Sequence, residues 1–253
     1  MLPLSDEVER KLFWERRFAR GFAPVSRRIV AEFRASISDG VPWIVEEYDE
    51  PIAAFLGTHY NAVGSEFALT VETGVDYALV ATALAALFSE HSRRTAPLIT
   101  GTTARDATRA RELAESSPDI APLIGAARRH AVAAVAPALL ARTMAARTTV
   151  IATTETQFAA EASKAETARI SAGADARLVR KVWQTVGDER VRVAHRDAEG
   201  QSVPVDEAFE VGGERLMYPR DTALGATPGN VINCRCSVWY DEQTIRAIRE
   251  GNR

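Results

Sequence analysis

Three residues in the last quarter of the chain have side chains that commonly bind zinc: His195, Cys234 and Cys236. Asp188 or Asp221 could supply a fourth ligand. The spacing argues against such a site. Zinc-binding cysteines are usually separated by at least two intervening residues, whereas only one residue lies between these two. We therefore expect no metal and no other cofactor, and keep zinc at His195, Cys234, Cys236 and Asp188 as the alternative.

The same residues also have a purely structural interpretation. A strand over 231–240 would place Cys234 and Cys236 on one buried face together with Ile232, Val238 and Tyr240. Thiols are well suited to apolar packing. Asp188 could begin a short helix over 189–196 that Gly200 ends, so that His195 packs inward while an arginine of the helix pairs with an aspartate.

A catalytic interpretation needs Cys234 as nucleophile, His195 as its general base and Asp188 to orient the histidine. The sequence has no glycine-rich phosphate loop, no H-E-x-x-H and no G-x-S-x-G. We therefore expect no enzyme. The alternative is a metal-dependent enzyme, such as a zinc-dependent hydrolase, or a nuclease or toxin-like module, centred on His195, Cys234 and Cys236.

Apolar residues at helical spacing predict that the N-terminal half of the chain is helical. The first helix is expected to begin at Ser5 and to stop at Gly21, and a second to cover 25–37. Later helices are expected over 76–89, 103–116, 120–144 and 154–172. Glycine and proline are expected to separate these helices at Pro97, Gly101, Pro118, Pro122 and Pro137, and residues 153–156 to cap the last one, which ends near Gly173.

After Gly173, tryptophan, valine, glycine and aspartate replace the alanine-rich pattern. A strand is expected over 178–185, and the pair Gly212-Gly213 between two short apolar runs predicts a hairpin. The predicted fold class is α+β: a mainly helical N-terminal region with long helices, followed by a small β-rich C-terminal module with one short helix.

An ordered series of residues in this second half resembles the phage Mu protein F-like, or minor head protein, family. The resemblance covers roughly residues 145–240 and rests on Trp183, Gln184, Thr185, Asp188, Arg190, Val191, Arg192, His195, Gly200, Phe209, Tyr218, Pro219, Arg220, Asp221, Ile232, Asn233, Cys234, Arg235 and Cys236. One departure is Arg220, since relatives often have glycine there, which leaves the turn geometry open.

The resemblance implies a structural minor head protein of a tailed bacteriophage. Such a protein would associate with the portal and the capsid interior, and would act in head morphogenesis, genome packaging or DNA delivery. Its implied partners are the portal protein and the major capsid or scaffold protein. Its implied location is the virion, in the head interior or at the portal vertex, after assembly in the host cytoplasm.

Four parts are expected along the chain: a variable helical region over 1–120, long connecting helices over 121–175, the Mu F-like C-terminal module over 176–240 and a tail over 241–253. The first region is strongly segregated in charge. Eight basic residues are expected on the outer faces of the first two helices, and no Lys or Arg follows until Arg93. They are Arg10, Lys11, Arg16, Arg17, Arg20, Arg27, Arg28 and Arg34.

The composition limits the remaining partners. The formal net charge of -3 opposes strong binding to DNA, so we expect incidental contact with packaged DNA at most. No apolar run approaches the roughly 20 residues that cross a bilayer, so no membrane contact is expected. The N-terminal residues mix acids and bases, and we expect no secretory signal there.

Overall fold

The computed structural model describes residues 4–71 and 74–251. The chain divides into two compact units, and each of its four long helices has residues in both. Unit 1 consists of residues 1–16, 58–88 and 152–253, and unit 2 of residues 17–57 and 89–151. The four-part division of the sequence remains a prediction, and residues 1–3, 72, 73, 252 and 253 of its first and last parts lie outside the described residues.

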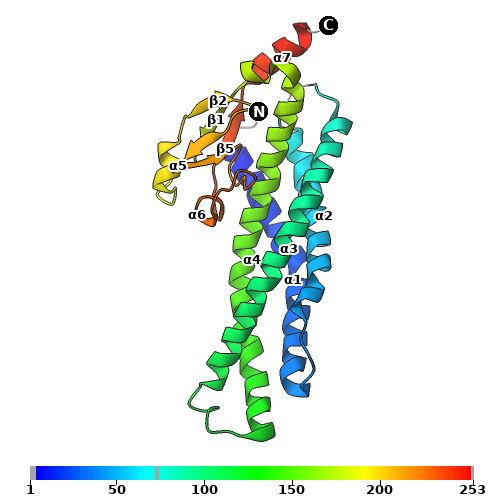
Figure 1. Cartoon of the computed structure of the whole chain (residues 1–253), viewed down its shortest axis with the longest axis vertical. Helices are drawn as coiled ribbons and strands as arrows, with labels where there is room; N and C mark the ends of the chain where they lie inside the picture. Colours follow the sequence, from blue (N-terminus) through cyan, green and yellow to red (C-terminus); the bar gives the residue numbers. More distant parts are fainter. Residues whose placement is uncertain (1–3, 72–73, 252–253) are drawn as a thin grey trace. The chain divides into compact units, whose positions relative to one another are not determined.

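The long helices are α1 (Leu4–Asp39), α2 (Asp49–Ala68), α3 (Tyr77–Glu115) and α4 (Gly125–Ala172), with a short 3₁₀ helix η1 (Val45–Tyr48) before α2 (Figure 1). Unit 2 contains α1 from residue 17 onward, α2 up to residue 57, α3 from residue 89 onward and α4 up to residue 151. Phe18 and Phe22 are buried in its core and pack against the half-buried Phe55, and the three ring centroids lie 5.0 to 5.7 Å apart. Aromatic packing of this kind holds α1 against α2 within the unit.

The predicted breaks at Gly21, Pro97, Gly101 and Pro137 are wrong, because each residue lies inside a continuous helix. Gly21 faces the ring of Phe55, and a Cβ there would come within 2.9 Å of it, so glycine serves close packing instead of ending the helix. Pro97 and Pro137 are each flanked by buried apolar residues: Ala96, Ile99, Ala136 and Leu140. This packing outweighs the hydrogen bond that each proline removes.

Residues 153–156 likewise lie inside α4 and do not cap a helix. Two other boundaries are confirmed. Pro118 and Pro122 lie in the connection between α3 and α4, and α4 ends at Ala172, just before Gly173. Gly173 has a φ of +56°, the left-handed conformation that ends a helix without the steric cost of a Cβ.

Unit 1 ends in a small β-rich module. After the 3₁₀ helix η2 (Gly173–Leu178) come β1 (Arg180–Gln184), α5 (Val193–Asp197), β2 (Ser202–Pro204), β3 (Phe209–Val211), β4 (Glu214–Leu216), α6 (Pro228–Val231), β5 (Ser237–Tyr240) and α7 (Glu242–Gly251). An antiparallel sheet has the order β2-β1-β5, and β3 and β4 form the predicted hairpin. The turn of the hairpin places Gly212 and Gly213 at positive φ. The predicted α+β class is therefore confirmed.

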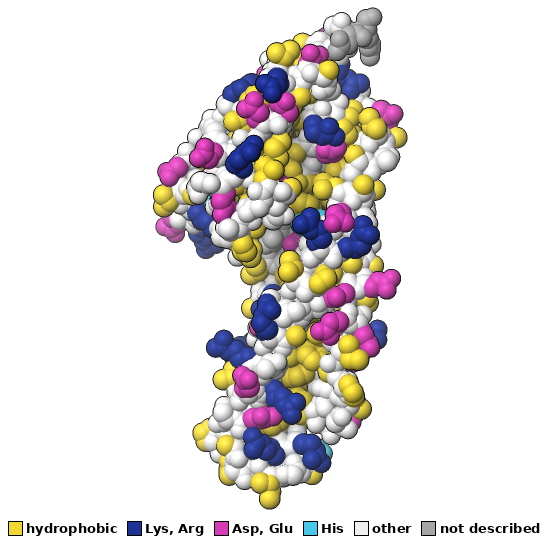
Figure 2. Space-filling view, in the orientation of Figure 1, with side chains coloured by type: hydrophobic (Ala, Val, Ile, Leu, Met, Phe, Trp, Pro, Cys, Tyr) yellow, Lys and Arg dark blue, Asp and Glu magenta, His cyan; other side chains and the backbone are white. Residues whose placement is uncertain are grey.

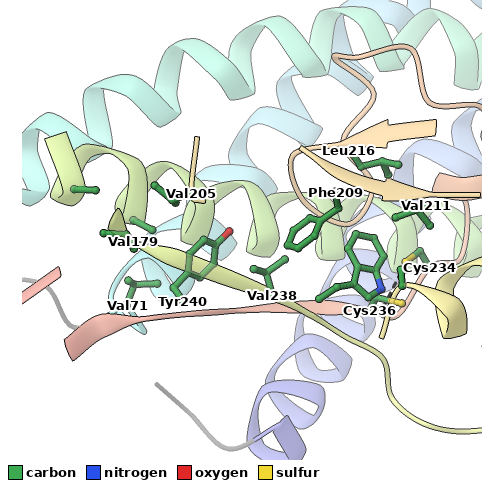
Figure 3. Packing of buried hydrophobic residues seen from close by; sticks show 14 of the residues in the cluster. Val71, Val179, Val205, Phe209, Val211, Leu216, Cys234, Cys236, Val238 and Tyr240 are labelled. Carbon is green, nitrogen blue, oxygen red and sulfur yellow. Dashed lines mark hydrogen bonds between the residues drawn. The ribbon is translucent and has the colours of Figure 1, made fainter. Parts of the chain in front are cut away.

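The core of this module joins both small sheets to the helices of unit 1. Trp183 and Phe209 are fully buried and meet edge to face, with ring centroids 5.3 Å apart. Figure 3 shows Cys234 and Cys236 close together in this cluster, and Tyr240, Val179 and Val71 further along it. Val71 follows α2, so the module is packed against the helical part of its own unit.

A buried charge network ties α1 to α4 within unit 1. The ammonium group of Lys11 lies 2.6 Å from both Glu7 and Glu161, and that of Lys164 lies 2.9 Å from Glu7 and 3.0 Å from Glu161. Lys11 is 1% exposed, so its predicted place on an outer basic face is wrong. The reason is nonlocal: its two carboxylate partners converge from α1 and α4, and Ser237 of β5 accepts a further hydrogen bond from it at 2.8 Å.

The network sets the ionisation of its members in opposite directions. Burial would raise the pKa of Glu7, but the two ammonium groups hold it well below its usual range. Burial of Glu161 prevails and raises the pKa of that carboxyl group. Burial alone would lower the pKa of Lys11, yet the two carboxylates raise it to about 12. Removing one member would thus leave a buried charge without its partner.

Candidate functional site

The two cysteines lie on a loop and not on the predicted strand. Strand β5 begins only at Ser237, after helix α6 and a turn in which Asn233 has a φ of +56°. This left-handed residue breaks the predicted alternation, and Ile232 is 40% exposed instead of sharing a face with the cysteines. The predicted burial of the thiols is confirmed, with Cys234 at 2% and Cys236 at 3% exposure.

His195 meets both thiols. It lies in α5, which begins at Val193 and is shorter than the predicted helix, because residues 189–191 form a turn. Its ring is buried and packs edge to face against Trp183 at 5.7 Å. The Nδ1 atom lies 3.4 Å from Sγ of Cys234 and 3.4 Å from Sγ of Cys236. The structure therefore brings the three sequence-predicted residues together.

The other ring nitrogen of His195 has a partner that the sequence did not suggest. Nε2 lies 3.3 Å from Oδ1 of Asn230 on α6. The amide nitrogen of Asn230 donates to Val211 O at 3.0 Å and to Glu214 Oε2 at 2.8 Å. These two bonds orient the amide. No spacing pattern pointed to Asn230, because it meets His195 only through the folding of distant loops.

The two thiols ionise unequally. The hydrogen bond from Cys236, helped by His195 and the guanidinium of Arg220, holds the pKa of Cys234 well below its ordinary value, although burial opposes this. The same hydrogen bond, together with burial and the negative charge on Cys234, raises the pKa of Cys236.

Arg220 holds the cysteine loop through its buried side chain. It has a φ of +73°, is 2% exposed, and its guanidinium donates from Nε to the carbonyl of Cys234 at 2.8 Å and also from Nη2. Burial lowers the pKa of Arg220 to about 10. The left-handed conformation resolves the turn geometry that the sequence left open: the turn has a positive φ at residue 220, which an arginine adopts here while its long side chain reaches the loop.

The two aspartates are kept away from the histidine by other partners. Asp188 binds Arg235 through two bonds of 2.7 Å, so the predicted pairing with an arginine of the short helix is wrong. Arg192 of that region donates to the carbonyl of Ile232 instead. Asp221 accepts hydrogen bonds from the backbone nitrogens of Met217 and Ala223 at 2.9 and 2.8 Å.

The remaining predicted motif residues lie in the frame around the cluster. Trp183 and Phe209 are core residues, and Pro219 is buried in the turn before Arg220. Gly200 has a φ of +75°, and its backbone nitrogen donates to Trp183 O at 2.9 Å, which joins the end of α5 to β1. These contacts give the motif a structural use: it fixes α5, the hairpin and the cysteine loop in one module.

The fold and the site together define a helical protein with a small α+β module, whose frame holds a buried His-Cys-Cys cluster. Residues 125–239 match the model of the family described as phage Mu protein F like protein, so the chain contains a phage Mu protein F-like domain. The match starts at the first residue of α4 and ends in β5, and so begins earlier than the predicted residue 145. No curated protein and no solved structure matches the chain.

Proposed function

We propose that this protein is a structural minor head protein of a tailed bacteriophage. The observation that carries the proposal is the phage Mu protein F-like domain over residues 125–239, a family that implies phage head morphogenesis. The protein would associate with the portal and the capsid interior and act in genome packaging or DNA delivery. It would reside in the head interior or at the portal vertex, after assembly in the host cytoplasm.

The proposed role assigns different work to the two ends of the chain. The polar side chains of the C-terminal module form hydrogen bonds within the module, as those of Asp188, Arg220 and Asn230 do. We therefore assign this module the role of a stable folding unit. The segment 1–120 has exposed basic side chains on α1, among them Arg16 and Arg20, followed by an acidic stretch. Such segregation suits contact with a charged protein surface, for which the portal, scaffold and major capsid proteins are the candidates.

Protein contacts are favoured over DNA contacts. The net charge is -3, and on the face shown in Figure 2 basic and acidic side chains are intermixed instead of forming one basic patch. Nonspecific DNA affinity depends on concentrated positive charge. Among the described residues, no helix is long and apolar enough to cross a membrane.

The geometry does not favour the catalytic alternative. That mechanism requires Asp188 to orient His195, whereas Arg235 occupies both oxygens of Asp188 and the ring nitrogens of His195 face Asn230 and the two sulfurs. The cluster is also deeply buried, which restricts the access of a substrate.

A pull-down tests the proposal. The tagged full chain is captured from cells that co-express the portal, scaffold and major capsid proteins of the same gene cluster, and the eluate is analysed by mass spectrometry. We expect the portal or capsid proteins to be recovered. The double variant Arg16→Glu, Arg20→Glu should recover less of them, while the control Arg215→Glu, exposed on β4, should recover as much as the wild type. Recovery of none of these proteins would contradict the proposal.

A further inference from the structure

Three donor atoms converge in the C-terminal module with spacings that suit one metal ion. Nδ1 of His195 lies 3.4 Å from each cysteine sulfur, and all three atoms lie within 4.8 Å of one another. A tetrahedral zinc ion, with Zn–S of about 2.3 Å and Zn–N of about 2.0 to 2.1 Å, places nitrogen and sulfur ligands about 3.6 Å apart. The two observed nitrogen–sulfur distances of 3.4 Å are close to this value.

The loop geometry removes the objection raised by the spacing of the cysteines. In an extended strand the side chains of Cys234 and Cys236 would project in parallel from one face. Here Asn233 is left-handed, and the carbonyl of Cys234 is anchored by Arg220, so the loop bends and both sulfurs approach the same nitrogen. One intervening residue is then sufficient for the two cysteines to act as a pair.

The hydrogen bonds around His195 select the form of the ring that a metal needs. Asn230 uses its amide nitrogen toward Val211 and Glu214, so it presents its oxygen to Nε2 of His195. This oxygen accepts a hydrogen bond from the Nε2–H group, which leaves the lone pair of Nδ1 directed at the sulfurs. Histidine ligands of metals are oriented in this way by an acceptor on the opposite nitrogen.

A fourth position is available beside the three donors. A cavity of about 10 Å³ adjoins His195, Cys234 and Cys236, and is also lined by Arg190, Arg192 and Arg235. A volume of this order holds about one water molecule. Among residues 4–71 and 74–251, no further His, Cys, Asp or Glu joins the three donors, so a water molecule in this cavity is the available fourth ligand.

We propose that His195 Nδ1, Cys234 Sγ and Cys236 Sγ bind one zinc ion, with a water molecule in the fourth position. Nitrogen and thiolate donors suit zinc and do not suit magnesium or calcium, which take oxygen ligands. Metal binding requires both cysteines as thiolates, and Zn²⁺ with two thiolates is neutral, so the ion adds no uncompensated charge to the buried site.

Elemental analysis of the purified full chain tests this site. The protein is expressed with zinc in the medium, kept reduced and isolated as a folded peak by size exclusion. We expect one zinc ion per chain in the wild type, and little or none in Cys234→Ser, Cys236→Ser and His195→Gln. Asp197→Asn, an exposed position at the end of α5, is the matched control, because it retains all three donors and the Asp188–Arg235 ion pair, and it should keep its zinc. Loss of zinc in Asp197→Asn would overturn the three-donor site.

A second measurement covers variants that fail to fold. The wild-type chain is stripped of metal with a chelator and titrated with Co²⁺, whose thiolate complexes give a charge-transfer absorption. We expect this band to appear and to saturate at one ion per chain, and Zn²⁺ to abolish it. A folded, reduced chain that contains no zinc and takes up no Co²⁺ would overturn the proposal, as would a Cys234–Cys236 disulfide in the chain as isolated from cells. The isolated chain is measured, so the result is independent of any role in the phage head.

Discussion

Arg220 shows how one residue can hold the cysteine loop in place. It occupies a left-handed conformation that costs a side-chain-bearing residue roughly 1 to 2 kcal/mol, and its buried guanidinium binds the carbonyl of Cys234. The cost of the backbone is therefore offset by hydrogen bonds that glycine cannot make. The sequence could identify position 220 as unusual, but not the direction in which the side chain turns.

Two substitutions at this position separate the backbone from the side chain. Arg220→Ala loses the hydrogen bonds and keeps the strained φ, and should lower the free energy of unfolding by about 2 to 4 kcal/mol. Arg220→Gly loses the same bonds but relieves the strain, and should be about 1 kcal/mol more stable than Arg220→Ala. Urea denaturation measures both. An alanine variant as stable as the glycine variant would contradict the argument.

Lys181 is a buried cation without a carboxylate at hydrogen-bonding distance among its described partners. Its ammonium group donates to Met217 O at 2.7 Å and lies 4.9 Å from the centre of the Phe209 ring. Burial lowers the pKa of Lys181 from 10.5 to about 8, against the pull of Asp221 and other acidic residues. Folding therefore disfavours the protonated form.

The sign of this shift gives a pH dependence. Between pH 8 and 10.5 the unfolded chain keeps the proton of Lys181 while the folded chain releases it, so stability rises with pH in that window. Relative to Lys181→Met, the free energy of unfolding of the wild type should increase by roughly 3 kcal/mol across the window. Chemical denaturation at several pH values measures the difference. A difference that stays flat from pH 8 to 10.5 would exclude the shift.

At the scale of elements, the long helices depend on packing more than on local sequence. The residue types glycine and proline led us to expect helix breaks at Gly21, Pro97 and Pro137. Each helix continues there because buried neighbours on both sides of the residue hold it. The periodicity of apolar residues predicted helix correctly, whereas the ends of the helices required knowledge of partners that lie far away in the sequence. The hairpin at Gly212-Gly213 was predictable, since its signal is contained in the turn itself.

Two helix glycines should respond oppositely to alanine. A Cβ at Gly64 would lie 2.6 Å from the ring of Phe88 and 2.7 Å from Oγ of Ser163, whereas at Gly101 it would meet nothing within 4 Å. Gly64→Ala should therefore destabilise the protein by about 1 to 3 kcal/mol. Gly101→Ala should stabilise it by about 0.5 to 1 kcal/mol, because alanine favours the helix.

Thermal or urea unfolding of the two glycine variants provides the comparison, and each serves as the control for the other. If Gly64→Ala were as stable as the wild type, the close approach of α2 to α3 and α4 at this point would be incorrect. If Gly101→Ala were destabilised, position 101 would not be an open site in the middle of α3.

Across the whole molecule, the candidate site was only partly predictable. Its three candidate donors were evident from residue type, and the burial of the two thiols was predicted correctly, although the strand from which it was predicted begins only after them. The convergence of the three donors was not predictable, because it depends on Asn230, Arg220 and the left-handed Asn233, which come from separate loops. The three lysines of the chain were equally hard to place from the sequence. Lysine is usually exposed, yet all three are buried in unit 1 because their partners come from distant segments.

The most direct measurement of the proposed function is quantitative mass spectrometry of gradient-purified phage particles produced by cells that carry this gene. The account predicts peptides of this protein in intact particles and in heads separated from tails, at a copy number nearer to that of the portal than to that of the major capsid protein. Absence of the protein from particles and procapsids, while it is abundant in the lysate, would contradict the account.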